Sequence, residues 1–340
     1  MPWNLTSLAA GCGRMWSWRR GSGGVARGEA ARVPTERGAA VRGVAVRAAR
    51  RVRAGLSKAE RARLTAAATR MGADCAVLDR ALASGVPLPA VHELAAQWES
   101  FTPAERAFIR DPLGGATPGP LSILGVPARQ VDQTTCGAAS LAMLLMVNNP
   151  GVAAWVATGR GTPVHPDAPA HSGTPSHPDA VLHRWEALQH AVHRRVRRRG
   201  LVFFPWPKAL GTPPWRVPHV ARYAGVRYAG RLVDDRSPAA VERLLAHAAA
   251  AVTDGIPVPL FVGADSRIGV QGLVPRHVVL LVARHGEDAF AVYEPGAGRI
   301  DVVADAAWTD GAVTGTKQAA WGFWWRPAWV FLPRRRTLRA

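Results

Sequence analysis

The pattern of apolar and polar residues divides the chain into a helical first part and a second part with many strands. The helical pattern begins at Ser57, where Ser57 and Glu60 form a capping-box pattern. Thr102 and Glu105 repeat this pattern, with Pro103 at the first helical position. The pattern predicts helices over about 57–69, 73–83 and 89–99, and another that begins at Pro103.

From about residue 121, one strongly apolar helix precedes a series of short strand-like runs. This helix is expected over residues 137–146 and is ended by Asn148-Asn-Pro-Gly151. Further helices are expected over about 183–199, 216–224 and 238–253. Strands are expected over 226–232, 258–262, 277–283, 289–293, 298–303 and 319–332. Helices that come first, with an antiparallel sheet after them, predict an α+β fold.

Shifts in composition suggest four regions. Residues 1–55 are rich in Gly, Ala and Arg and are expected to form a basic, disordered and solvated tail, with a basic helix over Val41 to Arg53 as the alternative. Residues 56–110 form a small helical region, and 111–120 form a Pro/Gly-rich linker. We interpret the double glycine Gly114–Gly115 as part of this linker and not as a self-cleavage site. The main domain is expected over residues 121–335.

Charge and hydropathy limit the partners of the protein. The chain of 340 residues has a formal net charge of +19, and much of the excess lies in blocks of arginine. These blocks fit an Arg-rich protein with solvated ends. They also fit a surface that binds nucleic acid or an anionic membrane. No nucleic-acid recognition motif accompanies these blocks. No run reaches the roughly 18 apolar residues that span a bilayer, and the first residues lack the order of a secretory signal. We therefore expect no integral membrane segment and a cytoplasmic location.

The three cysteines, Cys12, Cys75 and Cys136, are too few for a disulfide framework. Cys75 is expected in the core of the helical region. His165, His171 and His177 share a loop, but no Cys or acidic pattern supports a metal site there. We therefore expect no metal and no cofactor.

The segment around Cys136 carries the strongest indication of chemistry. Cys136 begins the apolar helix, and a helix N-terminus and a nearby imidazole both favour the reactive thiolate. A lone cysteine in an apolar helix is more often a core residue. The polar residues upstream of Cys136, from Gln130 to Thr135, argue against that interpretation.

His277 and Glu294 are candidates to assist the thiol. His277 opens an apolar strand and could act as general base and acid, and Glu294 ends the next strand and could fix the histidine tautomer. Separately, each residue also fits a strand edge or a surface turn. Gln130 is the candidate side-chain donor to an oxyanion, together with the backbone N–H of Cys136, and Gln133 competes with it for this role.

These residues resemble the motifs of the bacteriocin-processing, double-glycine leader peptidases and of their stand-alone relatives in the papain-like superfamily. Gln130 with Cys136–Gly137 matches their Gln-x5-Cys-Gly motif, and His277 matches their strand-opening histidine. Glu294-Pro-Gly-Ala-Gly298 matches their Asp-Pro-x-x-Gly motif, with Glu in place of Asp. The resemblance covers about residues 120–335, with an enlarged segment at roughly 155–235. It implies a papain-like fold, in which the helix of the catalytic cysteine packs on an antiparallel sheet.

The resemblance implies a cysteine-dependent hydrolase, most simply a peptidase, that acts on a peptide or protein. Glu294 is one methylene longer than the usual Asp, which puts its reach to His277 in question. No transmembrane bundle and no P-loop are present, so a role in coupled export does not carry over. A transglutaminase-like acyltransferase and a catalytically inactive peptide- or anion-binding module remain as alternatives. Trp206, Trp215 and Trp324 are candidates to line a cleft or to pack in the core.

Overall fold

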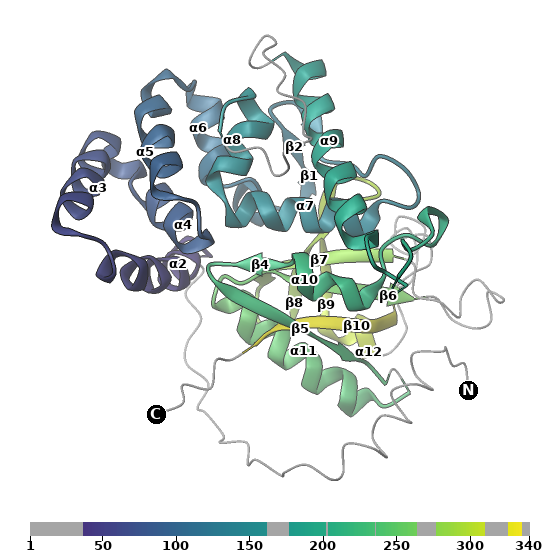
Figure 1. Cartoon of the computed structure of the whole chain (residues 1–340). Coiled ribbons are helices and arrows are strands. Elements are labelled where there is room, and N and C mark those ends of the chain that lie inside the picture. Colours follow the sequence, from purple (N-terminus) through teal and green to yellow (C-terminus); the bar gives the residue numbers. More distant parts are fainter. Residues whose placement is uncertain are drawn as a thin grey trace.

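A computed structural model of the protein describes residues 37–161, 177–201, 203–234, 236–263, 277–309 and 326–334. As expected, the fold is α+β: helices form the first part of the chain, and a large antiparallel sheet forms from the second part (Figure 1). Four residues named in the sequence analysis lie outside the described ranges: Cys12, His165, His171 and Trp324.

Within the described residues, five α-helices form the N-terminal part. They are α2 (Arg37–Ala54), α3 (Lys58–Met71), α4 (Ala76–Ser84), α5 (Leu88–Gln97) and α6 (Pro103–Arg110). Short 3-10 turns lie at Gly72–Asp74, Trp98–Ser100 and Gly114–Ala116. Both predicted capping boxes are present, so the predicted starts of α3 and α6 are confirmed. At the first, Ser57 N donates to Glu60 Oε2 at 2.7 Å and Glu60 N donates to Ser57 Oγ at 3.2 Å.

The expectation of a solvated tail over residues 1–55 is wrong for its last third. Helix α2 buries Ala45, Ala48 and Ala49, and it packs against α4. Alanine gives little hydrophobic signal in a sequence, but its small side chain allows two helices to approach closely. Arg53 of α2 also forms an ion pair with Asp79 of α4 at 2.7 Å. The alternative of a helix within this range is therefore the correct one.

Cys75 is exposed, contrary to the expectation of a core position. It lies at the junction between the 3-10 turn Gly72–Asp74 and α4, where its N–H donates to Gly72 O at 3.1 Å. Burial on α4 begins only at Val77 and Leu78. The predicted helix 73–83 in fact starts at Ala76, and this late start leaves Cys75 on the surface.

Six α-helices follow in the second part. They are α7 (Cys136–Asn148), α8 (Pro150–Thr158), α9 (Pro178–Arg197), α10 (Val217–Val220), α11 (Pro238–Thr253) and α12 (Asp305–Thr309). Helix α8 was not predicted, because the pattern Asn149-Pro-Gly indicates only the end of the preceding helix. Asn149 both follows α7 and caps α8, since its Oδ1 accepts from Gly151 N at 2.9 Å. Two further 3-10 turns lie at Lys208–Leu210 and Pro214–Arg216.

The main sheet has eight strands in the order β1-β9-β8-β7-β6-β10-β5-β4, and neighbouring strands pair antiparallel. They are β1 (Gly119–Pro120), β4 (Arg222–Tyr223), β5 (Val226–Leu232), β6 (Val258–Gly263), β7 (His277–His285), β8 (Ala289–Glu294), β9 (Arg299–Ala304) and β10 (Arg326–Pro333). A separate hairpin pairs β2 (Ser122–Ile123) with β3 (Val126–Pro127). The helix expected over 216–224 ends early, because the chain turns into β4 after Val220.

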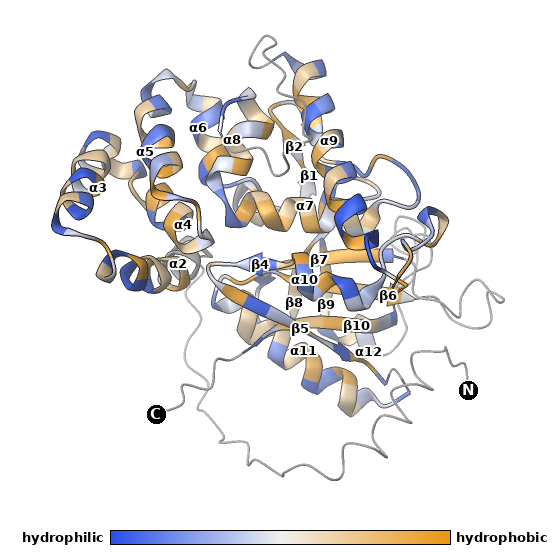
Figure 2. Cartoon of the chain, viewed as in Figure 1, coloured by the Kyte–Doolittle hydropathy of each residue, from blue (hydrophilic) through white to orange (hydrophobic). Residues whose placement is uncertain are grey.

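Helices cover the sheet on both faces. Helix α7 packs on β7, while α11 packs on β6, β7 and β10, and the two helices lie above and below the sheet in Figure 1. Strands β6 and β8 are therefore buried along their whole length, which agrees with the apolar runs at 258–262 and 289–292. Figure 2 shows α7 mostly in the apolar colours, as befits a helix buried on all sides.

Within the described residues, no single helix has the length and hydropathy to cross a bilayer. Helices α7 and α8 reach these values only as a pair, and the chain bends by 111° between them.

Two hydrophobic cores meet at α8. The smaller core joins the N-terminal helices and includes Ala154 of α8, whereas Val152 and Trp155 of the same helix belong to the larger core around α7 and the sheet. The segment 111–120 connects the two parts as an ordered structure. Leu113 is fully buried there, and the double glycine lies in a 3-10 turn in which Gly115 N donates to Asp111 Oδ2 at 2.6 Å.

Candidate active site

The antiparallel pairing of β7 and β8 brings His277 and Glu294 together. His277 is the first residue of β7 and Glu294 is the last of β8, so both lie at the same edge of the sheet. His277 Nε2 lies 2.8 Å from Glu294 Oε1. The question that the longer glutamate side chain raised is answered by this distance, because the carboxylate reaches the imidazole.

The carboxylate of Glu294 is held in one orientation by the turn that follows it. Gly296 N donates to Oε1 at 2.7 Å, and Ala297 N donates to Oε2 at 2.6 Å. The side chain is only 1% exposed. Burial raises the pKa of Glu294, but His277 and the two N–H donors outweigh burial and lower the pKa below its usual 4.5. Glu294 is therefore a fixed, buried negative charge behind the histidine.

His277 contacts both Cys136 and Glu294. Burial lowers the pKa of His277, but hydrogen bonding to Cys136 and to Glu294, and attraction to their charges, raise it to about 9. The imidazole is thus positively charged at neutral pH. A positive imidazole beside a sulfur favours the thiolate, which is the nucleophilic form of cysteine.

Cys136 is the first residue of α7 and is 3% exposed. The unpaired N–H groups and the dipole at a helix N-terminus also favour a negative sulfur. One turn later, the buried Ser140 Oγ donates to Val278 O of β7 at 2.8 Å. Since Val278 follows His277, this bond sets the position of the cysteine helix along the histidine strand. No local pattern in the sequence indicates this role of Ser140.

Gly137 allows a close approach between α7 and the loop that contains Thr212. A Cβ atom at Gly137 would lie 2.5 Å from Thr212 Oγ1 and 2.7 Å from Thr212 Cβ. Thr212 is 6% exposed, and its hydroxyl has no hydrogen-bond partner among the described residues. A buried hydroxyl without a partner, next to the cysteine, was not expected from the sequence.

The turn after Glu294 is fastened to the segment that precedes Cys136. Gln130 N donates to Pro295 O at 2.8 Å, and Tyr293 Oη donates to Ala128 O at 2.6 Å. Gly298 packs against the same segment, where a Cβ atom would lie 2.5 Å from Arg129 Cγ. Gly298 also has a φ of +65°, so glycine is required there on two grounds. These contacts hold Glu294 and the segment that leads to Cys136 as one unit.

Helix α9 supports this segment from another direction. Trp185 Nε1 and Gln189 Nε2 both donate to Arg129 O, at 2.8 and 3.0 Å. Gln189 Oε1 accepts from Val131 N at 3.1 Å. Gln189 is fully buried, and sequence reasoning missed it because its partners lie about 60 positions away in the chain.

Gln130 and Gln133 differ in their surroundings. Gln133 is exposed, whereas Gln130 is half-buried and its Nε2 donates to Asp132 O at 2.8 Å. The Oε1 atom of Gln130 is buried and has no partner among the described residues. Of the two glutamines, Gln130 is therefore the one that the backbone before Cys136 holds in place.

Asp132 adds a compensated negative charge near the cysteine. Its carboxylate accepts from Thr134 N at 2.8 Å and lies 3.2 Å from Lys208 Nζ. Burial raises the pKa of Asp132, but hydrogen bonds from Thr134 and Lys208 outweigh it and lower the pKa to about 2. Lys208 thereby connects the loop after α9 to the turn before Cys136.

The remaining candidates lie away from this constellation or on its rim. His177 caps α9 through Nδ1, and no group of three or more potential metal ligands occurs in the described ranges. Trp206 and Trp215 pack edge to face with ring centroids 5.0 Å apart, and Trp215 is exposed. A pocket of about 370 Å³, lined in part by Arg70, Trp98 and Arg106, belongs to the N-terminal helices. None of the four sequence-predicted site residues lines it.

The structure thus places Cys136, His277 and Glu294 in one chain of contacts, with Gln130 on the segment that is bonded to the Glu294 turn. Comparisons with protein-family models, with curated proteins and with solved structures gave no match to this chain. The functional conclusion therefore rests on the geometry of these residues and on their chemistry.

Proposed function

We propose that this protein is a cysteine-dependent hydrolase with a papain-like arrangement, and that it cleaves peptide bonds. The observation that carries the proposal is the contact chain from Cys136 through His277 to Glu294, in which Glu294 lies 2.8 Å from the imidazole. The placement of the cysteine at the start of a buried helix on an antiparallel sheet agrees with the same class. A thiol, an imidazole and an orienting carboxylate are the parts that acyl transfer requires.

In this mechanism the Cys136 thiolate attacks the carbonyl carbon of the scissile bond. His277, as imidazolium, donates its proton to the leaving amine, and an acyl-enzyme thioester remains. His277 then takes a proton from water, which attacks the thioester and regenerates the thiolate. Glu294 keeps its charge throughout and stabilises the imidazolium.

The oxyanion formed on attack requires donors close to the sulfur. The backbone N–H of Cys136 lies at the first position of α7, where N–H groups have no acceptor within the helix itself. Gln130 is the proposed side-chain donor, because Nε2 carries two hydrogens and the bond to Asp132 O uses only one. Loss of one such donor typically costs about 10²–10³ in rate.

The pH dependence of Cys136 alkylation by iodoacetamide tests the proposal without knowledge of the substrate. The protein should carry Cys12→Ser and Cys75→Ser, since Cys75 is exposed and would react as well. An isolated cysteine reacts appreciably only near pH 8.5, about its own pKa. We expect Cys136 to react rapidly at neutral pH and to lose this reactivity with His277→Ala. His285→Ala, at the exposed end of the same strand, is the matched control.

The outcomes separate the proposal from its rivals. An ordinary cysteine titration that His277→Ala leaves unchanged would exclude the thiolate pair and favour a binding module. If the pair exists, a fluorogenic peptide library tests hydrolysis. Added amines then distinguish a transferase, because a transglutaminase-like enzyme forms the amide product in preference to the acid.

A further inference from the structure

A short hairpin after α9 exposes an unusual amount of apolar surface. Leu201 and Phe204 form a two-residue antiparallel bridge, with N···O distances of 3.0 and 2.9 Å. Phe203 is 88% exposed and Phe204 is 70% exposed. Five of the seven large apolar side chains that are exposed in the described ranges lie in this one stretch: Leu201, Phe203, Phe204, Leu210 and Trp215. Such a concentration marks an interaction surface.

The base of the hairpin is held firmly. Arg197 O accepts from both Gly200 N and Trp206 N at 2.9 Å, and Trp215 Nε1 donates to Gly200 O at 2.9 Å. The edge-to-face contact of Trp206 and Trp215 supports it further. The two phenylalanines are therefore displayed by an ordered base.

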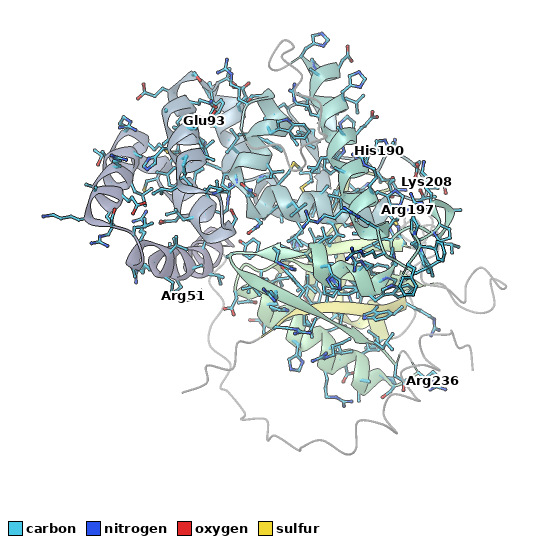
Figure 3. All side chains as sticks on the ribbon, viewed as in Figure 1. Arg51, Glu93, His190, Arg197, Lys208 and Arg236 are labelled. Atoms are coloured by element: carbon cyan, nitrogen blue, oxygen red, sulfur yellow. The ribbon has the colours of Figure 1, made fainter. Side chains whose placement is uncertain are left out.

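Positive charge surrounds the hairpin, and no acidic residue occurs between Glu186 and Asp234. Arg194, Arg195, Arg198 and Arg199 are exposed, and none forms an ion pair within the described part of the chain. Burial lowers the pKa of Arg222, and the charges of Arg227 and Arg195 lower it further. Figure 3 shows Arg197 and Lys208 together on this side, with Arg51 and Arg236 elsewhere.

We propose that Phe203, Phe204 and the four exposed arginines form a docking face for an anionic lipid bilayer. A protruding pair of aromatic rings suits the boundary between lipid headgroups and acyl chains, where such side chains bury their apolar area. Arginines beside them pair with anionic headgroups. An acidic polypeptide would pair with the arginines but would leave the phenylalanines in water. Single-stranded nucleic acid stacks its bases on aromatic rings, but it does so along a groove, whereas Phe203 and Phe204 are 88% and 70% exposed. Exposed rings beside the arginines therefore favour the bilayer.

The docking face is connected to the candidate active site through its own loop. Lys208 pairs with Asp132, and Thr212 packs on Gly137, next to Cys136. Bilayer docking goes beyond the proposed function and does not require it. If the hydrolase proposal also holds, docking keeps Cys136 near the membrane surface, and the substrates are peptides presented there.

Vesicle flotation tests the docking face. The full-length protein is mixed with vesicles of phosphatidylcholine alone or with added phosphatidylglycerol, and bound protein is measured as a function of lipid concentration. We expect binding only to the anionic vesicles. Arg198→Gln/Arg199→Gln should weaken it about 30-fold, since each cation at an anionic leaflet contributes about fivefold. Phe203→Ser/Phe204→Ser should weaken it at least as much. Arg50→Gln/Arg51→Gln and Leu182→Ser are the matched controls and should bind normally.

An environment-sensitive dye on residue 203 distinguishes insertion from adhesion. The dye is attached at Phe203→Cys in protein with Cys12→Ser, Cys75→Ser and Cys136→Ala, and a Val52→Cys protein is labelled as control. A blue shift with anionic vesicles at 203 and none at 52 supports the proposal. Unchanged binding by the phenylalanine variant, no binding to anionic vesicles, or tighter binding to polyglutamate or single-stranded nucleic acid would overturn it. Because Cys136→Ala is present, failure of the hydrolase proposal leaves this result unaffected.

Discussion

Ser140 Oγ lies 2.8 Å from the carbonyl oxygen of Val278, and this bond fixes the cysteine helix to the histidine strand. Ser140 is one helical turn after Cys136, and Val278 is the neighbour of His277 along β7. Apolar packing between α7 and β7 would allow the helix to slide by a fraction of its rise. The directional hydrogen bond removes that freedom, so Ser140 helps to set the distance from the Cys136 sulfur to the His277 imidazole.

Ser140→Ala should therefore have a larger effect on the rate of Cys136 alkylation than on the free energy of unfolding. Loss of a buried donor costs about 1–3 kcal/mol in stability, and a misplacement of about 1 Å costs about 10²-fold in rate. Urea unfolding and the rate of Cys136 alkylation provide the two measurements. Thr158→Val, which removes a buried hydroxyl bond within α8, is the control and should affect stability alone. Equal alkylation rates in both variants would contradict the positioning role.

Cys136→Ala should abolish turnover and alkylation and leave the fold intact. Alanine has a high helix propensity and fits the same buried position. Circular dichroism and thermal unfolding check the fold, and Cys75→Ser is the control because its side chain is exposed and outside the site. Hydrolysis by the Cys136→Ala protein would show that another group is the nucleophile.

Activity should fall as the pH rises through about 9. The pKa of His277 is raised from 6.5 to about 9, so the imidazolium persists below that pH and is lost above it. The contribution of this charge to stability is fully present below pH 6.5 and disappears as the pH approaches about 9. A pH–rate profile of hydrolysis measures the alkaline limb, because only hydrolysis needs the imidazolium to protonate the leaving amine. A limb that begins near pH 7 would mean that Cys136 and Glu294 do not stabilise the His277 imidazolium.

Glu294→Gln should move the alkaline limb to lower pH and reduce the rate by about 10²–10⁴. The amide removes the negative charge that helps to raise the pKa of His277. Glu294→Asp keeps the charge but shortens the reach to His277 and to the N–H groups of Gly296 and Ala297, which bind the Glu294 carboxylate. Its limb should lie between those of the wild type and Glu294→Gln. If both variants keep the wild-type profile, Glu294 does not orient the histidine.

Gly137→Ala should destabilise the protein by about 1–3 kcal/mol through overpacking. The added methyl group would overlap Thr212 Oγ1, Cβ and Cγ2, at 2.5, 2.7 and 3.2 Å. Thr212→Gly removes all three atoms, so the double variant should recover much of the loss. Urea unfolding of the four proteins in this cycle measures the coupling. Strictly additive losses would place the cost of Gly137→Ala elsewhere.

The sequence was informative wherever local pattern decides structure. The helix over Pro238–Thr253 and the starts of β6, β7 and β8 agree with the predicted limits, since each begins at a clear change in periodicity. The short strands β1 and β4 were missed, because two residues have no periodicity. The burial of helix α2 was not predicted, because a segment composed mainly of alanine and arginine has the composition of a solvated tail.

In the candidate site, too, some features follow from the sequence and others depend on contacts between distant segments. Antiparallel neighbours end at one edge, so the approach of His277 to Glu294 follows from the order of strands. The contribution of Ser140, Gln189 and Thr212 depends on contacts between segments far apart in sequence, and no local pattern encodes them. Those three residues complete the site that the motifs only outlined.

The two cores that meet at α8 bear on how the protein can be dissected. Ala154 belongs to the N-terminal core, while Val152 and Trp155 on the same short helix belong to the larger core that contains Cys136. Removal of residues 37–110 would strip one flank of α8 and expose an apolar face directly behind α7. The N-terminal helices are therefore an integral part of the fold and cannot be removed without loss of its stability. We expect both cores to unfold together in one cooperative thermal transition.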